Sequence, residues 1–200
     1  VYIWSVYTEC LHGMPSKCPI RVAVPVNLRP YFNSITTKNF FVMVSAEFHP
    51  TKETYTFAEV AAIVKESLRS QINRENLEKL FSYNVSNEKL LIARVVPLFL
   101  KNLAMKYVYT TSALANTATI TNIGNISVTE EYRPYVEMFH AFLAMSKGQH
   151  LKGTICSYGD TLVFSFSYDL VDASVQRGFF RKIASDGIAV EIKSNGVNYE

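Results

Sequence analysis

Apolar residues at the start of the chain recur at helical spacing. Val1–Leu11 carries them three or four positions apart, which predicts an amphipathic helix with one buried face. No Ser, Thr, Asp or Asn precedes this pattern, so the helix has no side-chain N-cap, and His12-Gly13 should end it. A helix that begins in mid-pattern is what we expect of a piece of a longer chain.

Two short runs of β-branched and aromatic residues follow, and both predict strands. Ile20–Leu28 has the pattern of a strand that is buried on both faces, and Phe40–Phe48 that of a second strand. Pro25 lacks a backbone N–H, so we expect an edge or a bulge at that position. Arg29-Pro30 should end the first strand.

Helical spacing returns after residue 55. Thr56 is a candidate N-cap, and Glu59 stands three residues later, which is the pattern of a capping box. Residues 74–83 should continue as helix. The apolar residues of the first of these helical stretches are Phe57, Val60, Ala61, Val64 and Leu68.

Leu90–Tyr109 predicts a long apolar helix that carries Arg94, Lys101 and Lys106. Pro97 should kink this helix or start it afresh. A basic amphipathic helix can lie on a membrane or cover a lipid-like ligand. The alternative is a core-packing helix with a solvated basic edge. We favour the core-packing alternative and therefore expect no membrane contact.

The remaining sequence is mostly of strand type. Tyr158-Gly159-Asp160 predicts a tight hairpin turn, and a helix should run from about Asp172 to Ser185. We therefore predict one domain over residues 1–200, of the α/β (α+β) class, with helices packed on a single mixed β-sheet. The further predicted strands are Thr117–Ile123, Val136–Ala144, Thr154–Ser157, Leu162–Tyr168 and Ile188–Ile192.

Composition indicates that part of the surface is not made for water. Charged residues are 18% of the chain, against a usual share of about 25%, and the chain has 12 Tyr and 13 Phe. This composition excludes a disordered tail, a coiled coil and a collagen-like chain. The net charge of +3 comes from scattered residues, so we expect no nucleic-acid partner.

The cysteines and histidines predict no metal site. Cys10, Cys18 and Cys156 have no CxxC spacing, which favours free thiols in a reducing, cytoplasmic compartment. A Cys10–Cys18 bridge is the alternative. The four histidines are far apart in sequence, and none has a Cys, Asp or Glu at ligand spacing. His140 lies in a strand-like apolar run, where we expect a structural role.

The familiar catalytic motifs are missing from the sequence. There is no Walker A loop, no GxGxxG and no GxSxG elbow. Cys156 has no activating base near it in sequence, so it is interpreted as a packed thiol. The first aspartate is Asp160, and every earlier acid is a glutamate. We find no complete catalytic constellation in this chain.

Two segments nevertheless suggest a site. Arg29, in PVNLRPYF, directly follows a predicted buried strand, and a buried arginine is costly unless it is paired. It lies on the surface, or it pairs with a later acid or with another piece of protein. Thr121–Ile126 (TNIGNI) predicts a turn with exposed backbone N–H groups and positive φ. Such turns line pockets, but they also simply connect strands.

Several short motifs follow one another along the chain. They are PVNLRP at 25–30 with TKNFF at 37–41, VVPLFLKNLAMK at 95–106, TNIG at 121–124, YGD at 158–160 and RGFFR at 177–181. In this order they resemble the C-terminal half of the chloramphenicol-acetyltransferase-like acyltransferases, closest to bacterial alcohol acetyltransferases and condensation-domain relatives. The resemblance covers nearly all 200 residues.

The resemblance implies two similar subdomains with a tunnel between them. In that family a His-His-x-x-x-Asp motif of the N-terminal half supplies the general base that deprotonates an alcohol or amine acceptor, which attacks an acyl-CoA thioester. Arg29 corresponds to the arginine that pairs with the motif's aspartate. Thr121, Asn122, Gly124 and Asn125 would lie on the tunnel wall and help to hold the thioester or its oxyanion. Acyl-CoA is the implied co-substrate, with no tightly bound cofactor.

The sequence departs from the family pattern because no histidine is followed four residues later by aspartate. No residue of this chain is therefore expected to be catalytic, and the expected partner is the N-terminal subdomain. An exposed half-interface could also self-associate. Either Leu162, Phe164 and Phe166 or the alternating Val163, Ser165 and Ser167 should face the tunnel. A non-catalytic binding or interaction module of the same fold is the alternative.

Overall fold

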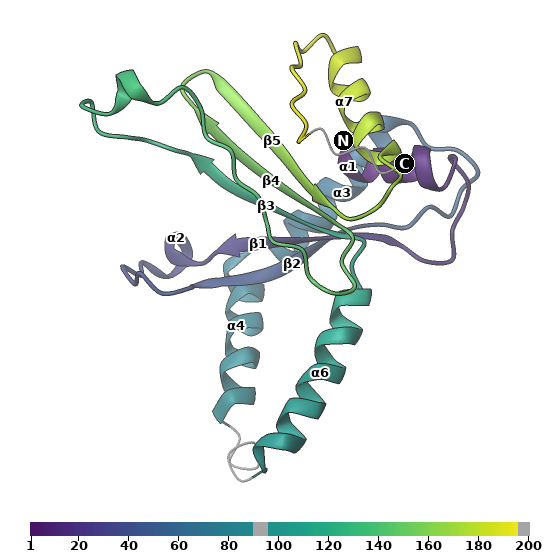
Figure 1. Ribbon diagram of the computed structural model, residues 1–200. Helices are drawn as coiled ribbons and strands as arrows, with labels where there is room; N and C mark the ends of the chain where they lie inside the picture. Colours follow the sequence, from purple (N-terminus) through teal and green to yellow (C-terminus); the bar gives the residue numbers. More distant parts are fainter. Residues whose placement is uncertain (90–95, 196–200) are drawn as a thin grey trace.

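A computed structural model describes residues 1–89 and 96–195, except for the side chains of residues 84–89 and 112–114. Its centre is one five-stranded sheet in the order β2-β1-β3-β4-β5 (Figure 1). The β1–β3 and β3–β4 pairs are parallel, whereas the two outer pairs are antiparallel. The mixed sheet is thus confirmed. The strands are β1 (Ile20–Asn27), β2 (Phe41–Phe48), β3 (Ala118–Asn125), β4 (Leu151–Tyr158) and β5 (Thr161–Tyr168).

The N-terminal helix, α3 and α7 begin close to the residues where local sequence signals place them, whereas α4 runs on to Lys89, beyond its predicted end at residue 83. The N-terminal helix is confirmed, although its second part is a π-helical turn, and the capping box of Thr56 and Glu59 is formed. Ser174 donates its N–H to the Asp172 carboxylate at 2.9 Å, just before α7. The helices are α1 (Tyr2–Ser5), η1 (Val6–Cys10), α2 (Arg29–Phe32), α3 (Phe57–Gln71), α4 (Arg74–Lys89), α6 (Leu98–Leu114), η2 (Arg133–Tyr135) and α7 (Ser174–Ser185).

Pro25 lies where the sheet has a local edge. β1 pairs with β2 along its whole length, but it pairs with β3 only at Val22 and Ala23. The N–H and C=O of Arg21 face β3, where they bond to Thr117, and residues two apart point the same way. The nitrogen of Pro25, which has no hydrogen to donate, therefore points to the side where β3 no longer pairs with β1. The proline thus removes no hydrogen bond between strands. The predicted edge is confirmed.

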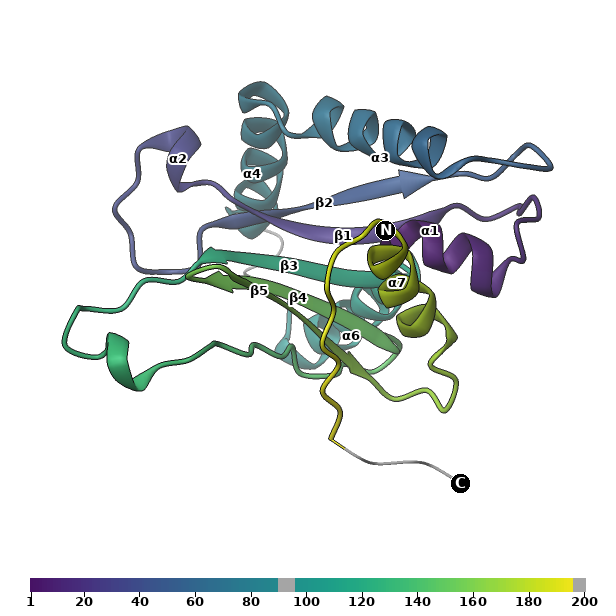
Figure 2. The ribbon, with the colours of Figure 1, turned by 90° about the horizontal axis from the view of Figure 1, so that it is seen from above.

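All the buried apolar clusters lie on one face of the sheet. α1, α3 and α7 cover one part of this face, around Phe48, Val60 and Phe179. α4 covers another part through Leu77, which packs with Val42 and Val44. Figure 2 shows α3 running alongside the edge strand β2. One layer of sheet with helices on it is therefore the observed architecture.

α3 also protects the free edge of β2. Gln71 accepts the Ser45 N–H at 3.2 Å through Oε1 and donates to the Ser45 carbonyl at 2.8 Å through Nε2. Ser67 Oγ accepts the Glu47 N–H at 3.1 Å. These polar side chains occupy backbone groups that an unpaired edge would offer to another strand.

Two predicted strands are wrong. Residues 136–144 form no strand, and their carbonyls instead accept bonds from side chains of β4: the Phe139 carbonyl from Cys156, and the Ala144 carbonyl from Lys152. Residues 188–192 form no strand either, and Ile188 and Ile192 are both exposed, so their alternation buries no face. The Gly159-Asp160 hairpin turn between β4 and β5 is confirmed.

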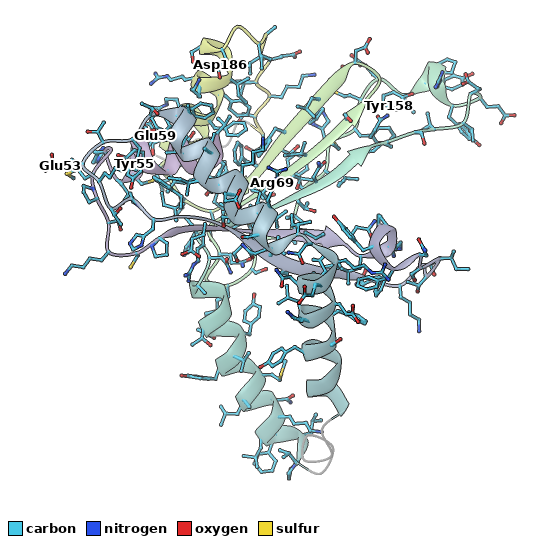
Figure 3. The ribbon with its side chains drawn as sticks, turned by 180° about the vertical axis from the view of Figure 1, so that it is seen from behind. Glu53, Tyr55, Glu59, Arg69, Tyr158 and Asp186 are labelled. Atoms are coloured by element: carbon cyan, nitrogen blue, oxygen red, sulfur yellow. The ribbon has the colours of Figure 1, made fainter. Side chains whose placement is uncertain are left out.

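The long apolar helix differs from its prediction. Pro97 starts a new helix, because its carbonyl accepts the N–H groups of Leu100 and Lys101 at 3.1 Å. The predicted start at Leu90 falls outside the described residues. α6 extends away from the sheet (Figures 1 and 3), and its apolar side chains are exposed. The expectation of core packing is wrong for this helix.

Candidate functional site

Arg29 fastens a loop. It lies in α2, directly after β1, and is half-buried. Its Nε donates to the Thr36 carbonyl at 2.9 Å, Nη2 to the Lys38 carbonyl at 2.6 Å, and Nη1 to Asn27 Oδ1 at 3.2 Å. Among the side chains that the structure describes, no carboxylate lies within 4 Å of the guanidinium. The pairing with an acid of this chain is therefore not observed.

The TNIGN segment forms a β-bulge. Asn122 opposes Ile155 and Gly124 opposes Cys156, so Ile123 is the extra residue and is half exposed. Gly124 has φ +84°, a left-handed conformation that favours glycine. Asn122 Oδ1 accepts the Gly124 N–H at 2.9 Å. The predicted positive φ is confirmed, but the predicted turn is wrong, because the segment is a bulge inside β3 and stays paired with β4 through Asn125. The Gly124 N–H is already used and is not exposed for a ligand.

Strand alternation separates Thr121 from Asn122. Residues opposite each other across a ladder share a face of the sheet. Asn122 is opposite Ile155 and so lies on the helix-covered face, where Ile155 opposes Phe164. Thr121 is opposite Thr154, and Thr154 is opposite Ser165, on the other face. Three hydroxyl residues on three adjacent strands thus form one row, which we call the hydroxyl row.

The hydroxyl row lies on a face where polar groups are buried. Thr154 is 2% exposed, and its Oγ1 has no hydrogen-bond partner in the described part of the chain. Lys152, two residues earlier, is 8% exposed and donates from Nζ to the Ala144 carbonyl and to Ser146 Oγ, each at 2.7 Å. Native structures leave few buried polar atoms unpaired, so the Thr154 hydroxyl stands out.

Residues 139–146 cover this polar face in part. Besides the contacts of Lys152, Cys156 Sγ donates to the Phe139 carbonyl at 3.3 Å. Tyr158, at the far end of β4 (Figure 3), packs its ring edge-on against Phe139, with centroids 5.3 Å apart. On β5, Phe164 and Phe166 pack on Phe179 and α7. Val163, Ser165 and Ser167 are therefore the set that faces away from the helices.

An apolar cavity of about 190 Å³ lies on the opposite, helix-covered face, between α1, α3 and the sheet. It is comparable in size to the roughly 150 Å³ apolar cavity that binds benzene in an engineered protein. It can therefore hold a small apolar group, and its described lining has no carboxylate, imidazole, thiol or lysine side chain. Its lining includes Tyr2, Trp4, Val22, Val24, Phe57 and Ile120.

One pair of chemically active side chains was not foreseen from sequence. His150 Nδ1 lies 2.9 Å from Asp169 Oδ1, because β4 and β5 are antiparallel and bring their outer ends together. Both side chains are more than half exposed, so the pair is a surface contact and not a buried catalytic dyad. His140 is exposed and lies in irregular structure, which corrects its placement in a strand.

Helix capping and burial displace several pKa values, and the hydrogen-bonded ion pair with Glu47 raises the pKa of Arg21. Hydrogen bonds from the Thr56 backbone and hydroxyl lower the pKa of Glu59. Hydrogen bonds from the Ser174 hydroxyl and backbone lower the pKa of Asp172, and burial raises the pKa of the Tyr2 phenol. These shifts have structural causes, namely helix capping, core packing and an ion pair.

No protein-family model matches the chain, and no curated protein matches its sequence.

Cys10, Cys18 and Cys156 are free thiols, so the Cys10–Cys18 bridge is not formed. In the described residues, no group of three His, Cys, Asp or Glu side chains is placed to hold a metal, and no helix is long and apolar enough to cross a bilayer.

Proposed function

We propose that this chain is the C-terminal half of an acyl-CoA-dependent O-acyltransferase of the chloramphenicol-acetyltransferase-like superfamily. In this proposal the half supplies one wall of the donor and acceptor tunnel and is not catalytically complete alone. The order of the motifs described above supports it. The observation that carries it is the hydroxyl row of Thr121, Thr154 and Ser165, which lies beside the TNIGN bulge on the face of the sheet opposite α3 and α7.

Thr121 and the bulge have different tasks in this proposal. Thr121 faces the tunnel and offers its hydroxyl to the thioester oxygen, where a donor stabilises the charge that develops during acyl transfer. Asn122 acts as a positioning residue, because its side chain holds the Gly124 N–H and shapes the end of β3. Thr154 belongs to the same row, but it is 2% exposed, so Thr121 is the member of the row that is open to a molecule in the tunnel.

Arg29 can donate hydrogen bonds to a second subdomain while it keeps its bonds to its own loop. A guanidinium has five N–H donors, and contacts with described residues use three of them. The remaining donors suit a carboxylate from the partner half, as the resemblance implies. The partner is thus expected to be the N-terminal subdomain, and the acceptor a small alcohol or amine.

The test joins this chain to an N-terminal half that carries His-His-x-x-x-Asp and measures transfer from acetyl-CoA to small alcohols and amines. We expect turnover in the joined protein and none in the chain alone. Thr121→Val should lower kcat/KM by about 10²-fold, the effect of losing one oxyanion donor. Thr119→Val, two residues earlier on the same face, is the matched control. A joined protein that binds acyl-CoA without turnover would instead indicate a binding module.

Arg29→Ala tests the pairing between the halves. In the chain alone it removes the loop bonds and should lower the free energy of unfolding by about 1 kcal/mol. In the joined protein it also leaves a buried carboxylate unpaired and should cost about 3–5 kcal/mol. Urea denaturation of both proteins, with and without the substitution, measures the difference. Equal losses in the two proteins would contradict the pairing.

A further inference from the structure

The surface of α6 is unusually apolar for a helix in contact with water. Most of its apolar side chains are between 45% and 72% exposed. Scattered exposed apolar residues are normal in proteins, but a contiguous set marks an interaction site. The most exposed members are Leu98, Phe99, Leu103, Met105, Tyr107 and Val108.

These side chains surround the helix. Leu98, Phe99 and Leu100 are consecutive and exposed, and successive residues of a helix are about 100° apart, so they point in three directions. A helix that docks on one protein surface presents a single apolar stripe. A helix that is apolar on all sides suits an environment that is apolar on all sides. Figure 3 shows side chains projecting from both flanks of α6.

The charge of this region has one sign. No acidic residue occurs between Glu88 and Glu130, and the charged residues of α6 are Lys101 and Lys106. The neighbouring α4, in contrast, carries Glu75 and Lys79 as an exposed ion pair. A basic and apolar helix complements an anionic lipid surface, because lysine stems lie along acyl chains while their ammonium groups reach the headgroups.

The polar groups near the sheet end of α6 also suit an interface with lipid. Thr110 and Thr111 donate their hydroxyls to the Lys106 and Tyr107 carbonyls at 2.8 and 2.7 Å, so these hydroxyls are satisfied within the helix. Tyr107 and Tyr109 are exposed beside them. Tyrosine gathers at membrane–water interfaces, where its ring lies in an apolar layer and its hydroxyl stays in water.

We propose that α6 is a membrane-contact surface that enters the headgroup and outer acyl region of an anionic bilayer. Leu98 and Phe99, at the end remote from the sheet, enter deepest, and Tyr107 and Tyr109 lie at the headgroups. The 17-residue helix is about 25 Å long, shorter than the roughly 30 Å hydrocarbon core, so it inserts without spanning. This inference goes beyond the proposed acyltransferase function and does not depend on it.

The test is flotation of the full chain with vesicles of phosphatidylcholine that contain about one-third phosphatidylserine. We expect binding, and Phe99→Glu should lower the bound fraction by about tenfold or more, because a carboxylate in the acyl region is costly. Ile35→Glu is the matched control, since Ile35 is 99% exposed in the loop after α2 and should not affect binding. Circular dichroism checks that each variant stays folded.

Substitution of the two lysines of α6 provides a second test, which leaves the apolar side chains of the helix unchanged. Lys101→Gln and Lys106→Gln should each lower binding to the anionic vesicles roughly fivefold, and added salt should lower the binding of the unchanged chain. Binding that Phe99→Glu leaves unchanged would overturn the proposal. The proposal would also be overturned if the chain did not bind vesicles and instead formed a dimer in ultracentrifugation. If Phe99→Glu dissociated that dimer, the surface of α6 would bind a second copy of the chain.

Discussion

α3 and α6 are helices of similar length, but α3 packs against the sheet and α6 is exposed. α3 begins at a capping box, buries Val60 against the sheet and bonds the edge of β2 through Ser67 and Gln71. α6 begins after Pro97 and exposes Leu98 and most of its other apolar side chains. The helix with the greater apolar content is the exposed one. Burial therefore depends on whether apolar side chains share one face that can meet the sheet.

The largest expected contrast is between two phenylalanines. Phe48 is fully buried beneath α1 and α3, edge-on to Tyr7 and Tyr55, whereas Phe99 on α6 is 69% exposed. Phe48→Ala should lower the free energy of unfolding by about 3–5 kcal/mol. Phe99→Ala, the matched substitution, should change it by less than about 0.5 kcal/mol. Urea denaturation measures both, and a large loss for Phe99→Ala would show that α6 is buried in solution.

A smaller effect should distinguish the start of α3. Thr56→Ala removes the hydroxyl that accepts the Glu59 N–H at 3.3 Å, and should destabilise the chain by about 1 kcal/mol. Thr110→Ala on α6 removes a hydroxyl that bonds only within its own helix, so it should change stability by less than about 0.5 kcal/mol. Thermal unfolding of the two variants compares them. Equal losses of stability in the two variants would mean that the capping box does not stabilise α3.

The smallest contrast is in the response to acid. The pKa of Glu59 is lowered in the folded chain from its ordinary value of 4.5, so its contribution to stability is present above that value. That contribution is lost as the pH falls through the lower, folded pKa. Glu59→Gln should therefore weaken the dependence of the melting temperature on pH in the range below about pH 5. Glu66→Gln, on the same helix away from the capping box, should not. Identical pH profiles for both variants would contradict this assignment.

Several local features could be predicted from the sequence. The capping box of Thr56 and Glu59, the Gly159-Asp160 turn and the new helix after Pro97 each formed as expected. The positive φ expected at Gly124 is also present, although in a bulge inside β3 and not in a turn, and Asn122 itself occupies the Gly124 N–H. In each case the partners are at most a few residues apart. Their geometry follows from the backbone preferences and hydrogen-bonding groups of neighbouring residues.

Other features depended on partners that are distant in sequence. Val136–Ala144 has a strand-like pattern, but its carbonyls bond to Lys152 and Cys156 of a strand that comes later in the chain. The approach of His150 to Asp169 requires the pairing of β4 with β5. Thr121 was predicted as a site residue, but its neighbours in the hydroxyl row, Thr154 and Ser165, were not connected with it. Strand order alone brings these three residues together.

The sequence by itself determined the start of α3 at its capping box, the Gly159-Asp160 turn and the new helix after Pro97, because those signals act over three or four residues. Only the tertiary structure decided that Arg29 bonds to its own loop, that the hydroxyl row lies on the face opposite α3 and α7, and that the described apolar side chains of α6 are exposed. The physical reason is that the burial of a side chain depends on the free energy of contact with elements from elsewhere in the chain. An apolar helix without such a partner remains exposed, whatever its periodicity.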